Sequence, residues 1–81
     1  MFHKIQKVEV KDDYVLIAIF NDGTKKKYDM KPLMNKNDIF DDLKYNNLFK
    51  MAYVDQGGYG IVWNDDIDLS SEDIWENGVE I

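Results

Sequence analysis

Three carboxylates lie close together near the C-terminus, at Asp65, Asp66 and Asp68. Carboxylate oxygens are preferred ligands of calcium and magnesium, so a cation-binding protein or a metal-dependent enzyme is one alternative for this chain. A calcium loop of the EF-hand type that began at Asp66 would place Ser71 where a glycine is needed and Asn77 where a bidentate glutamate is needed. The pattern lacks both diagnostic residues, and we therefore expect no dedicated metal site.

A second interpretation of this stretch is that it ends a small fold. Ser70 can accept a hydrogen bond from the amide of Asp73 and so cap a short helix. Gly78 follows that helix and would supply the positive φ angle that often ends one. Asp68 would brace the turn before the helix, because acidic residues are common at helix starts. This interpretation gives the serine, the acids and the glycine local structural roles.

Nucleophilic and phosphate-binding sites have little support in the sequence. His3 is the only histidine and cysteine is absent, so a histidine-assisted nucleophile or a thiolate metal site has no partner of the usual kind. The glycines at 57, 58 and 60 are not followed by the lysine-serine pair of a phosphate loop, and a hairpin turn is predicted there. We expect no enzyme, no catalytic residue, no cofactor and no bound metal.

The charges favour a protein partner over a polyanion. The formal net charge is −6 at pH 7, and the pI is about 4.5. All basic residues are lysines, so bidentate arginine contacts with phosphate or guanine do not exist. The basic cluster Lys25, Lys26 and Lys27 is typical of a solvated edge strand, but an acidic partner or RNA could also contact it. A nucleic-acid-associated regulator is the second alternative, although we do not expect the chain alone to bind nucleic acid.

Hydrophobic residues near the C-terminus predict an interaction surface. Trp63 follows a strand alternation and is expected in the core. Trp75 cannot share the direction of Ile74 on a short helix, so we expect it to be partly exposed. Together with Val79 and Ile81 it would form an apolar patch suited to an unidentified protein partner or to a homo-oligomer.

Five strands and two helices follow from the spacing of apolar residues and from turn signals. Residues 14–20 are apolar at every position, so we expect both faces of that strand to be covered. Asp22 and Gly23 predict a tight hairpin. Pro32 ends the next strand, and Asn37 caps the central helix. The strands are expected at 5–10, 14–20, 24–30, 48–54 and 59–63.

These elements predict an α+β fold with one small, mainly antiparallel sheet of about five strands. Their order is strand-strand-strand-helix-strand-strand-helix, with one central helix and a short C-terminal helix. With 81 residues, no repeat and no linker, we expect a single domain over 1–81. No apolar run approaches the roughly 18 residues of a membrane span, and the lack of cysteine fits a reducing compartment, so a cytoplasmic location is expected.

The order of several short motifs resembles the bacterial domain-of-unknown-function family numbered 2442. The motifs are FNDG at 20–23, YDMKPL at 28–33, IFDDL at 39–43, LFKMAYVDQGG at 48–58 and WNDDIDLSSEDIW at 63–75. The resemblance covers nearly the whole chain and implies a small α+β fold without established chemistry. It also implies that some members are antitoxin-like partners and that others carry an appended DNA-binding domain. We expect no such appendage here.

These observations lead to one functional expectation. The chain is interpreted as a noncatalytic protein-interaction module, and more specifically as an antitoxin-like partner of a small bacterial protein. We expect the interaction surface to include Trp75, Val79 and Ile81, together with the three lysines at 25–27.

Overall fold

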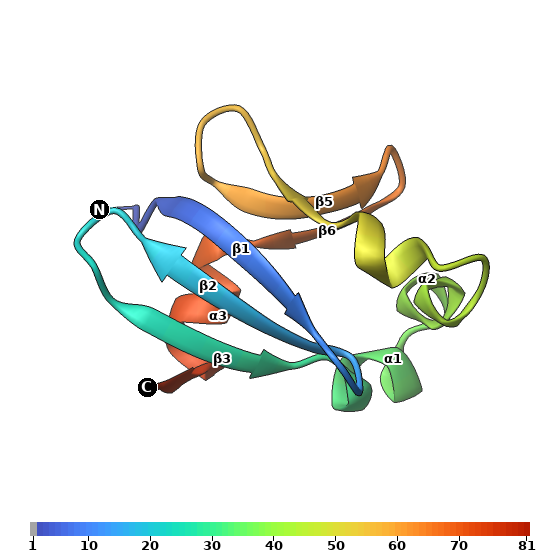
Figure 1. Cartoon of the computed structure of the whole chain (residues 1–81). Coiled ribbons are helices and arrows are strands. Elements are labelled where there is room, and N and C mark those ends of the chain that lie inside the picture. Colours follow the sequence, from blue (N-terminus) through green and yellow to red (C-terminus); the bar gives the residue numbers. More distant parts are fainter. Residues whose placement is uncertain (1) are drawn as a thin grey trace.

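The N-terminal strands form an antiparallel meander within the larger of two sheets. The computed structural model describes residues 2–81, and Figure 1 shows how its elements are arranged. β1 (Ile5–Lys11) pairs with β2 (Val15–Phe20), and β2 pairs with β3 (Lys25–Asp29). The short strand β7 (Val79–Glu80) adds to the free edge of β3, so the strand order is β1-β2-β3-β7.

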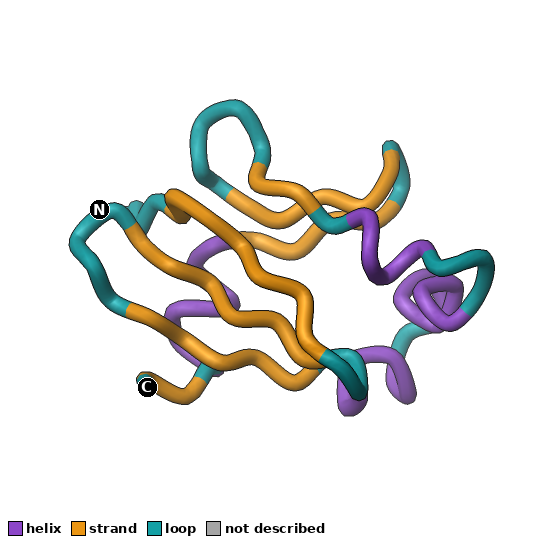
Figure 2. Tube along the Cα trace, in the orientation of Figure 1, coloured by secondary structure: helices purple, strands orange, loops and turns teal. Residues whose placement is uncertain are grey.

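A smaller antiparallel sheet is formed by the strands that follow the central helices. Its order is β4 (Tyr53–Val54), β5 (Gly60–Asn64) and β6 (Ile67–Ser70). The two sheets are separate in Figure 2, where strands are orange. The amide of Ile5 donates to the carbonyl oxygen of Gly58 at 2.8 Å. This hydrogen bond joins the start of β1 to the loop between β4 and β5.

The segment that connects β3 of the larger sheet to β4 of the smaller sheet consists mainly of short helices. They are α1 (Lys31–Lys36), α2 (Asp38–Asp41) and the 3₁₀ helices η1 (Asp42–Lys44) and η2 (Leu48–Met51). All lie at one end of the molecule, at the right of Figure 1. Pro32 stands in the first turn of α1, where its missing N–H has no helical partner to lose. The side chain of Asn37 caps α2 by accepting a hydrogen bond from the amide of Ile39 at 3.0 Å.

The C-terminal helix α3 (Ser71–Asn77) covers one face of the larger sheet and contacts β3, β5 and β6. Ser70 caps it, because the hydroxyl oxygen accepts a hydrogen bond from the amide of Asp73 at 3.1 Å. This cap is the one predicted from the sequence. Within residues 2–81, none of the helices combines the length and the apolar character needed to cross a membrane.

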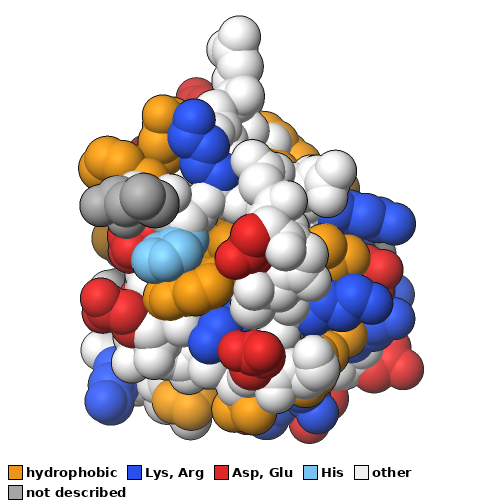
Figure 3. All heavy atoms as spheres, turned by 90° about the vertical axis from the view of Figure 1, so that its left-hand side faces the viewer, with side chains coloured by type: hydrophobic (Ala, Val, Ile, Leu, Met, Phe, Trp, Pro, Cys, Tyr) orange, Lys and Arg blue, Asp and Glu red, His pale blue; other side chains and the backbone are white. Residues whose placement is uncertain are grey.

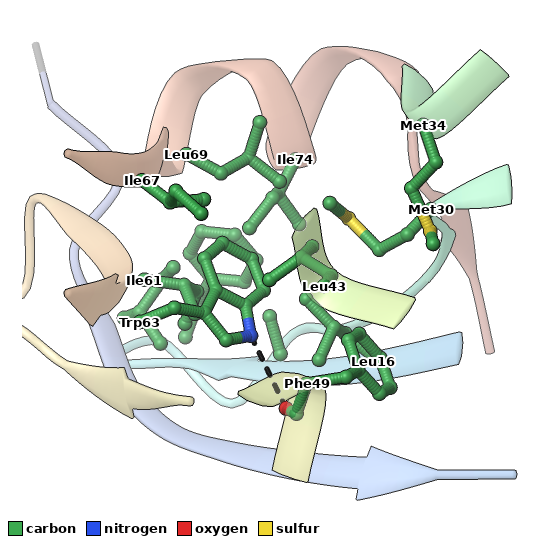
Figure 4. Close-up of a cluster of buried hydrophobic side chains, with 13 residues drawn as sticks. Leu16, Met30, Met34, Leu43, Phe49, Ile61, Trp63, Ile67, Leu69 and Ile74 are labelled. Carbon is green, nitrogen blue, oxygen red and sulfur yellow. Dashed lines mark hydrogen bonds between the residues drawn. The ribbon is translucent and has the colours of Figure 1, made fainter. Parts of the chain in front are cut away.

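The core lies between the two sheets and α3. Leu16, Ala18 and Phe20 of β2 are at most 1% exposed and supply one wall. Figure 4 shows the indole of Trp63 among these buried side chains. Its Nε1–H donates to the carbonyl oxygen of Phe49 at 3.1 Å. The indole therefore fills the core while its one polar group is satisfied.

The α+β class and the antiparallel pairing of the strands are confirmed, but the single sheet of five strands is wrong. Residues 48–54, predicted as one strand, form η2 and then the two residues of β4. Asn46 and Asn47 have φ angles of 57° and 58°, which turn the chain before η2. The 3₁₀ turn buries Phe49 against Trp63, with ring centroids 6.3 Å apart. Packing against the second sheet thus overrides the alternation that predicted a strand.

Three elements were not predicted at all. α1 begins where the sequence predicted only the end of a strand at Pro32. β6 precedes α3 and forms the far edge of the smaller sheet, and β7 joins β3 after α3. Both strands are too short for their alternation to stand out in the sequence.

Candidate interaction surface

One face of the larger sheet is open among the described residues. The even-numbered residues of β2 are buried in the core, so Val15, Ile17 and Ile19 point to the opposite face and are only half-buried. Figure 1 looks onto this face, and α3 lies behind the sheet. The expectation that both faces of residues 14–20 are covered is therefore wrong. Within residues 2–81, no second layer of helix or strand covers the other side of β2.

Strand pairing places charged residues on both sides of this aliphatic row. We define the outer sheet face as Val15, Ile17 and Ile19 of β2, with Lys7, Glu9 and Lys11 of β1 and Lys25, Lys27 and Asp29 of β3. The long alkyl stems of lysine can cover neighbouring apolar side chains while the ammonium groups stay in water. The half-buried state of the aliphatic row agrees with such partial cover.

The positive charges of the outer sheet face are only partly balanced. The Glu9 carboxylate lies 3.9 Å from Lys7 Nζ and 3.6 Å from Lys11 Nζ, and all three side chains are at least 36% exposed. Exposed pairs at such distances contribute little. Lys25 and Lys27 form no ion pair within residues 2–81. The face therefore carries excess positive charge on an acidic protein.

The lysine cluster at 25–27 is divided by the strand that carries it. Lys25 and Lys27 point to the outer sheet face, whereas Lys26 is half-buried on the other side of β3. Lys26 Nζ lies 5.0 Å from the centroid of the Trp75 ring, a cation–π distance. The sequence suggested one basic spot, but the fold separates it into two environments.

Trp75 belongs to an aromatic cluster at the N-terminal end of the molecule. Its indole stacks on the imidazole of His3, with centroids 3.8 Å apart and planes at 8°. Phe20 meets the same indole edge-on, at 5.0 Å and 83°. Figure 3 shows the histidine (pale blue) lying over hydrophobic side chains (orange) on this side of the protein. Trp75 is half-buried, because His3 and Lys26 cover parts of its two-ring surface.

Glu72 of α3 fixes His3 in this position. The carboxylate accepts a hydrogen bond from the His3 amide at 2.6 Å and lies 3.1 Å from the His3 Nδ1. Chiefly the backbone amide of His3, and then its ring, hold the pKa of the Glu72 carboxyl below its ordinary value of 4.5. The sequence shows no catalytic partner for His3, whereas the structure ties this residue to α3 through Glu72.

Val79 and Ile81 are exposed, at 66% and 60%, but they do not share a patch with Trp75. Val79 pairs with Lys27, so its side chain lies on the same side of the larger sheet as the outer sheet face. Trp75 lies under Lys26 on the other side of the sheet. A groove of about 660 Å³ beside Val79 continues toward the start of α1 and is also lined by Leu33. The predicted apolar patch is therefore split in two.

The acidic stretch does not converge on a common point. The side chain of Asn64 accepts hydrogen bonds from the amides of Asp66 and Ile67, both at 2.9 Å, and so braces the turn between β5 and β6. Asp68, expected to brace a turn before the C-terminal helix, lies instead on β6, which runs directly into α3. Asp65 and Asp66 are exposed in the turn, and Asp68 is exposed on β6. Within residues 2–81, no three His, Cys, Asp or Glu side chains are arranged to hold a metal ion.

The predicted roles of the remaining turn residues agree with the structure at Asp22 and Gly23 but not at Gly78. Asp22 accepts a hydrogen bond from the amide of Thr24 at 2.9 Å, and this bond lowers the pKa of the Asp22 carboxyl. Gly23 has a φ angle of +91°, as the hairpin requires. Gly78 has a φ angle of −76°, so the predicted left-handed end of α3 is wrong. A glycine fits there for another reason, because a Cβ would lie 2.6 Å from the carbonyl oxygen of Ile74.

Sequence reasoning missed the residue at the centre of the outer sheet face. Ile17 was interpreted as buried because the whole strand is apolar. A signal was present in the neighbouring strands, where charged residues alternate: Lys7, Glu9 and Lys11 precede β2, and Lys25, Lys27 and Asp29 follow it. Pairing of those strands with β2 makes the lysines flank Ile17 on a single face.

Comparisons with known proteins identify a family for this chain but no activity. Neither a curated protein nor a solved structure matches the chain. A protein family described as "Protein of unknown function (DUF2442)" matches residues 5–80, which span both sheets and all the helices. The chain belongs to the DUF2442 family.

Proposed function

We propose that the chain is a noncatalytic, cytoplasmic protein-interaction module that acts as an antitoxin-like partner of a small bacterial protein. The observation that carries this proposal is the outer sheet face. A strand with one face in the core and one in water usually alternates apolar with polar residues. β2 instead presents Val15, Ile17 and Ile19 to the open side.

Burying this aliphatic row against another protein would remove apolar surface from water. Each side chain that becomes fully buried contributes roughly 1.5 to 3 kcal/mol at most, and less here because the row is already half-buried. The row lies on β2, which is fixed by pairing on both sides. A partner would therefore meet a preformed surface and would not have to order it.

The antitoxin-like role rests on the resemblance to family members with that role, and the cytoplasmic location rests on the absence of cysteine. The cation-binding or metal-dependent alternative has weaker support, because Asp65, Asp66 and Asp68 are exposed and dispersed. The nucleic-acid alternative also has weaker support, since Lys26 faces away from Lys25 and Lys27.

The proposal is tested by purifying a tagged chain from its own host in three forms: the native sequence, Ile17→Glu and Ile17→Val. The native chain and Ile17→Val should each retain the same protein in stoichiometric amount through gel filtration. Ile17→Glu should lose it, because a carboxylate then stands in the centre of the aliphatic row. Circular dichroism establishes that all three forms are folded. A native chain that emerges without any stable partner contradicts the proposed function.

The antitoxin-like part needs a second measurement. The captured protein is expressed alone and together with each form of the chain. Growth should be inhibited by the protein alone and restored by the native chain and by Ile17→Val, but not by Ile17→Glu. If the captured protein never affects growth, the antitoxin-like role is contradicted, while the chain is still a protein-interaction module.

A further inference from the structure

We propose that the outer sheet face binds an acidic amphipathic helix of the partner, an inference that rests on the function proposed above. The face combines one aliphatic row with lysines on both sides of it. A helix with an apolar stripe between two rows of carboxylates has the complementary pattern. This inference names the chemistry of the segment that docks.

The spacing of the strands matches the width of a helix. β1 and β3 are both neighbours of β2, so their side-chain rows are about 10 Å apart, twice the distance between adjacent strands. A helix with its side chains is about 10 Å wide. When it lies along β2, its apolar stripe meets the aliphatic row and its flanking positions lie above the lysines of β1 and β3.

The length of the aliphatic row also suits a helix. Val15, Ile17 and Ile19 are alternate residues of one strand, and alternate residues are about 7 Å apart, so the row spans roughly 13 Å. That length corresponds to about two and a half helical turns. Three or four apolar residues at i, i+3, i+4 and i+7 would therefore cover it.

Charge complementarity selects an acidic helix over other occupants. Lysines outnumber carboxylates by four to two on the outer sheet face, while the whole chain has a net charge of −6. Lys25 and Lys27 have no ion-pair partner within residues 2–81. A helix with glutamates on both flanks would pair with these ammonium groups and with those of Lys7 and Lys11.

A second copy of the chain and a nucleic acid fit the same face less well. Two copies placed face to face would bring their lysine rows together, and like charges in contact oppose association. A nucleic acid could use the lysines, but its phosphates would leave the aliphatic row of Ile17 and its neighbours without an apolar partner. Binding of a second copy or of a nucleic acid would give experimental results that differ from those expected for an acidic helix.

The test uses the full chain labelled with ¹⁵N and two designed helical peptides of about 14 residues, or four turns. Both peptides carry the same leucine stripe, flanked in one by glutamates and in the other by lysines. The glutamate peptide should shift the amide signals of 15–19 and 25–29. Its affinity should fall at least several-fold between about 0.05 M and 0.5 M salt, because the Debye length becomes much shorter. The lysine peptide should cause no shift.

Two variants make the test specific to this face. Ile17→Glu should abolish the shifts caused by the glutamate peptide. Tyr53→Glu introduces the same charge on β4, at a side chain that is 53% exposed and lies on the other sheet. This matched control should bind the glutamate peptide as the native chain does. Unchanged dispersion of the amide spectrum confirms that each variant is folded.

Several results would overturn the inference. Equal binding of both peptides shows that charge does not select the occupant. Shifts on this face that depend on the concentration of the chain alone show a second copy. Stronger shifts with oligouridylate than with the glutamate peptide show a nucleic-acid surface. If Ile17→Glu loses the host partner but the glutamate peptide does not bind, the proposed function is supported and the inference of an acidic helix is contradicted. If no host partner exists, the proposed function itself is contradicted.

Discussion

The imidazole of His3 lies flat against the indole of Trp75, with ring centroids 3.8 Å apart. These two residues are far apart in the sequence, and their contact attaches the N-terminal segment to α3. Glu72 lies one turn before Trp75 on the same helix. Its carboxylate completes the attachment by accepting a hydrogen bond from the His3 amide. The cluster therefore joins the first and last parts of the chain through one carboxylate.

The first prediction is that acid releases this attachment. The folded-state pKa of Glu72 is below its ordinary value of 4.5, so its contribution to stability is present above pH 4.5 and is lost as the pH falls through the lowered pKa. The amide shift of His3 in ¹⁵N spectra should follow this titration with a midpoint below 4.5. The Glu72→Gln variant should show no such step. A midpoint at or above 4.5 would contradict the hydrogen bond as the cause.

The second prediction concerns Tyr28 at high pH. Burial of the phenol, followed by the charge and hydrogen bond of Asp73, raises the pKa of Tyr28 to about 12. Because the folded-state pKa is raised above 10, this group's contribution to stability is complete below pH 10 and is lost as the pH rises through about 12.

Ultraviolet titration of tyrosinate should show one tyrosine ionising near pH 12, and Tyr28→Phe should remove that step. Asp73→Asn should move the step to lower pH, because the nearby negative charge is gone while the side-chain size is kept. If the ionisation step of Tyr28 is unchanged in Asp73→Asn, burial alone raises the pKa of Tyr28 and Asp73 does not contribute.

The third prediction compares two glycines with positive φ angles. Gly23 has a φ of +91° and open space around it, whereas Gly58 has a φ of +78° and a Cβ there would lie 2.7 Å from the carbonyl oxygen of Ile5. Gly23→Ala should cost about 1 kcal/mol in the free energy of unfolding, which is the conformational cost alone.

Gly58→Ala should cost about 3 kcal/mol, since the clash also disturbs the hydrogen bond between the Ile5 amide and the Gly58 carbonyl. Urea unfolding of both variants, with equal denaturant slopes, measures the difference. Equal losses would mean that the loop between β4 and β5 can move away from β1 at little cost.

The fourth prediction separates the two tryptophans. Trp63→Phe removes the Nε1–H that donates to the Phe49 carbonyl inside the core, and a buried acceptor without its partner costs about 1 to 3 kcal/mol. The missing ring volume adds to this loss. Trp75→Phe should cost clearly less, because Trp75 is half-buried and, within residues 2–81, its indole N–H donates no hydrogen bond, unlike that of Trp63. Denaturant unfolding of the two variants provides the comparison.

Much of the fold could be predicted because its signals are local. The cap at Ser70 and the cap at Asn37 each depend on a side chain and an amide two or three residues away. The hairpin at Gly23 depends on one backbone angle. Strand β1 follows from alternation, β2 from the apolar run at 14–20, and the hairpin to β3 from turn chemistry, all of which involve only neighbouring residues.

Contacts between distant segments decided the rest. Residues 48–51 alternate like a strand, yet they form η2 because Phe49 packs against Trp63 of β5. His3 looked isolated in the sequence until α3 placed Glu72 and Trp75 beside it.

The outer sheet face shows the same division most clearly. The sequence by itself determined that β2 is apolar on both sides and that lysines recur before and after it. Only the tertiary structure decided that α3 and the second sheet cover one side and leave Ile17 on the other, because a chain of 81 residues has enough helix and strand to bury one face of its larger sheet.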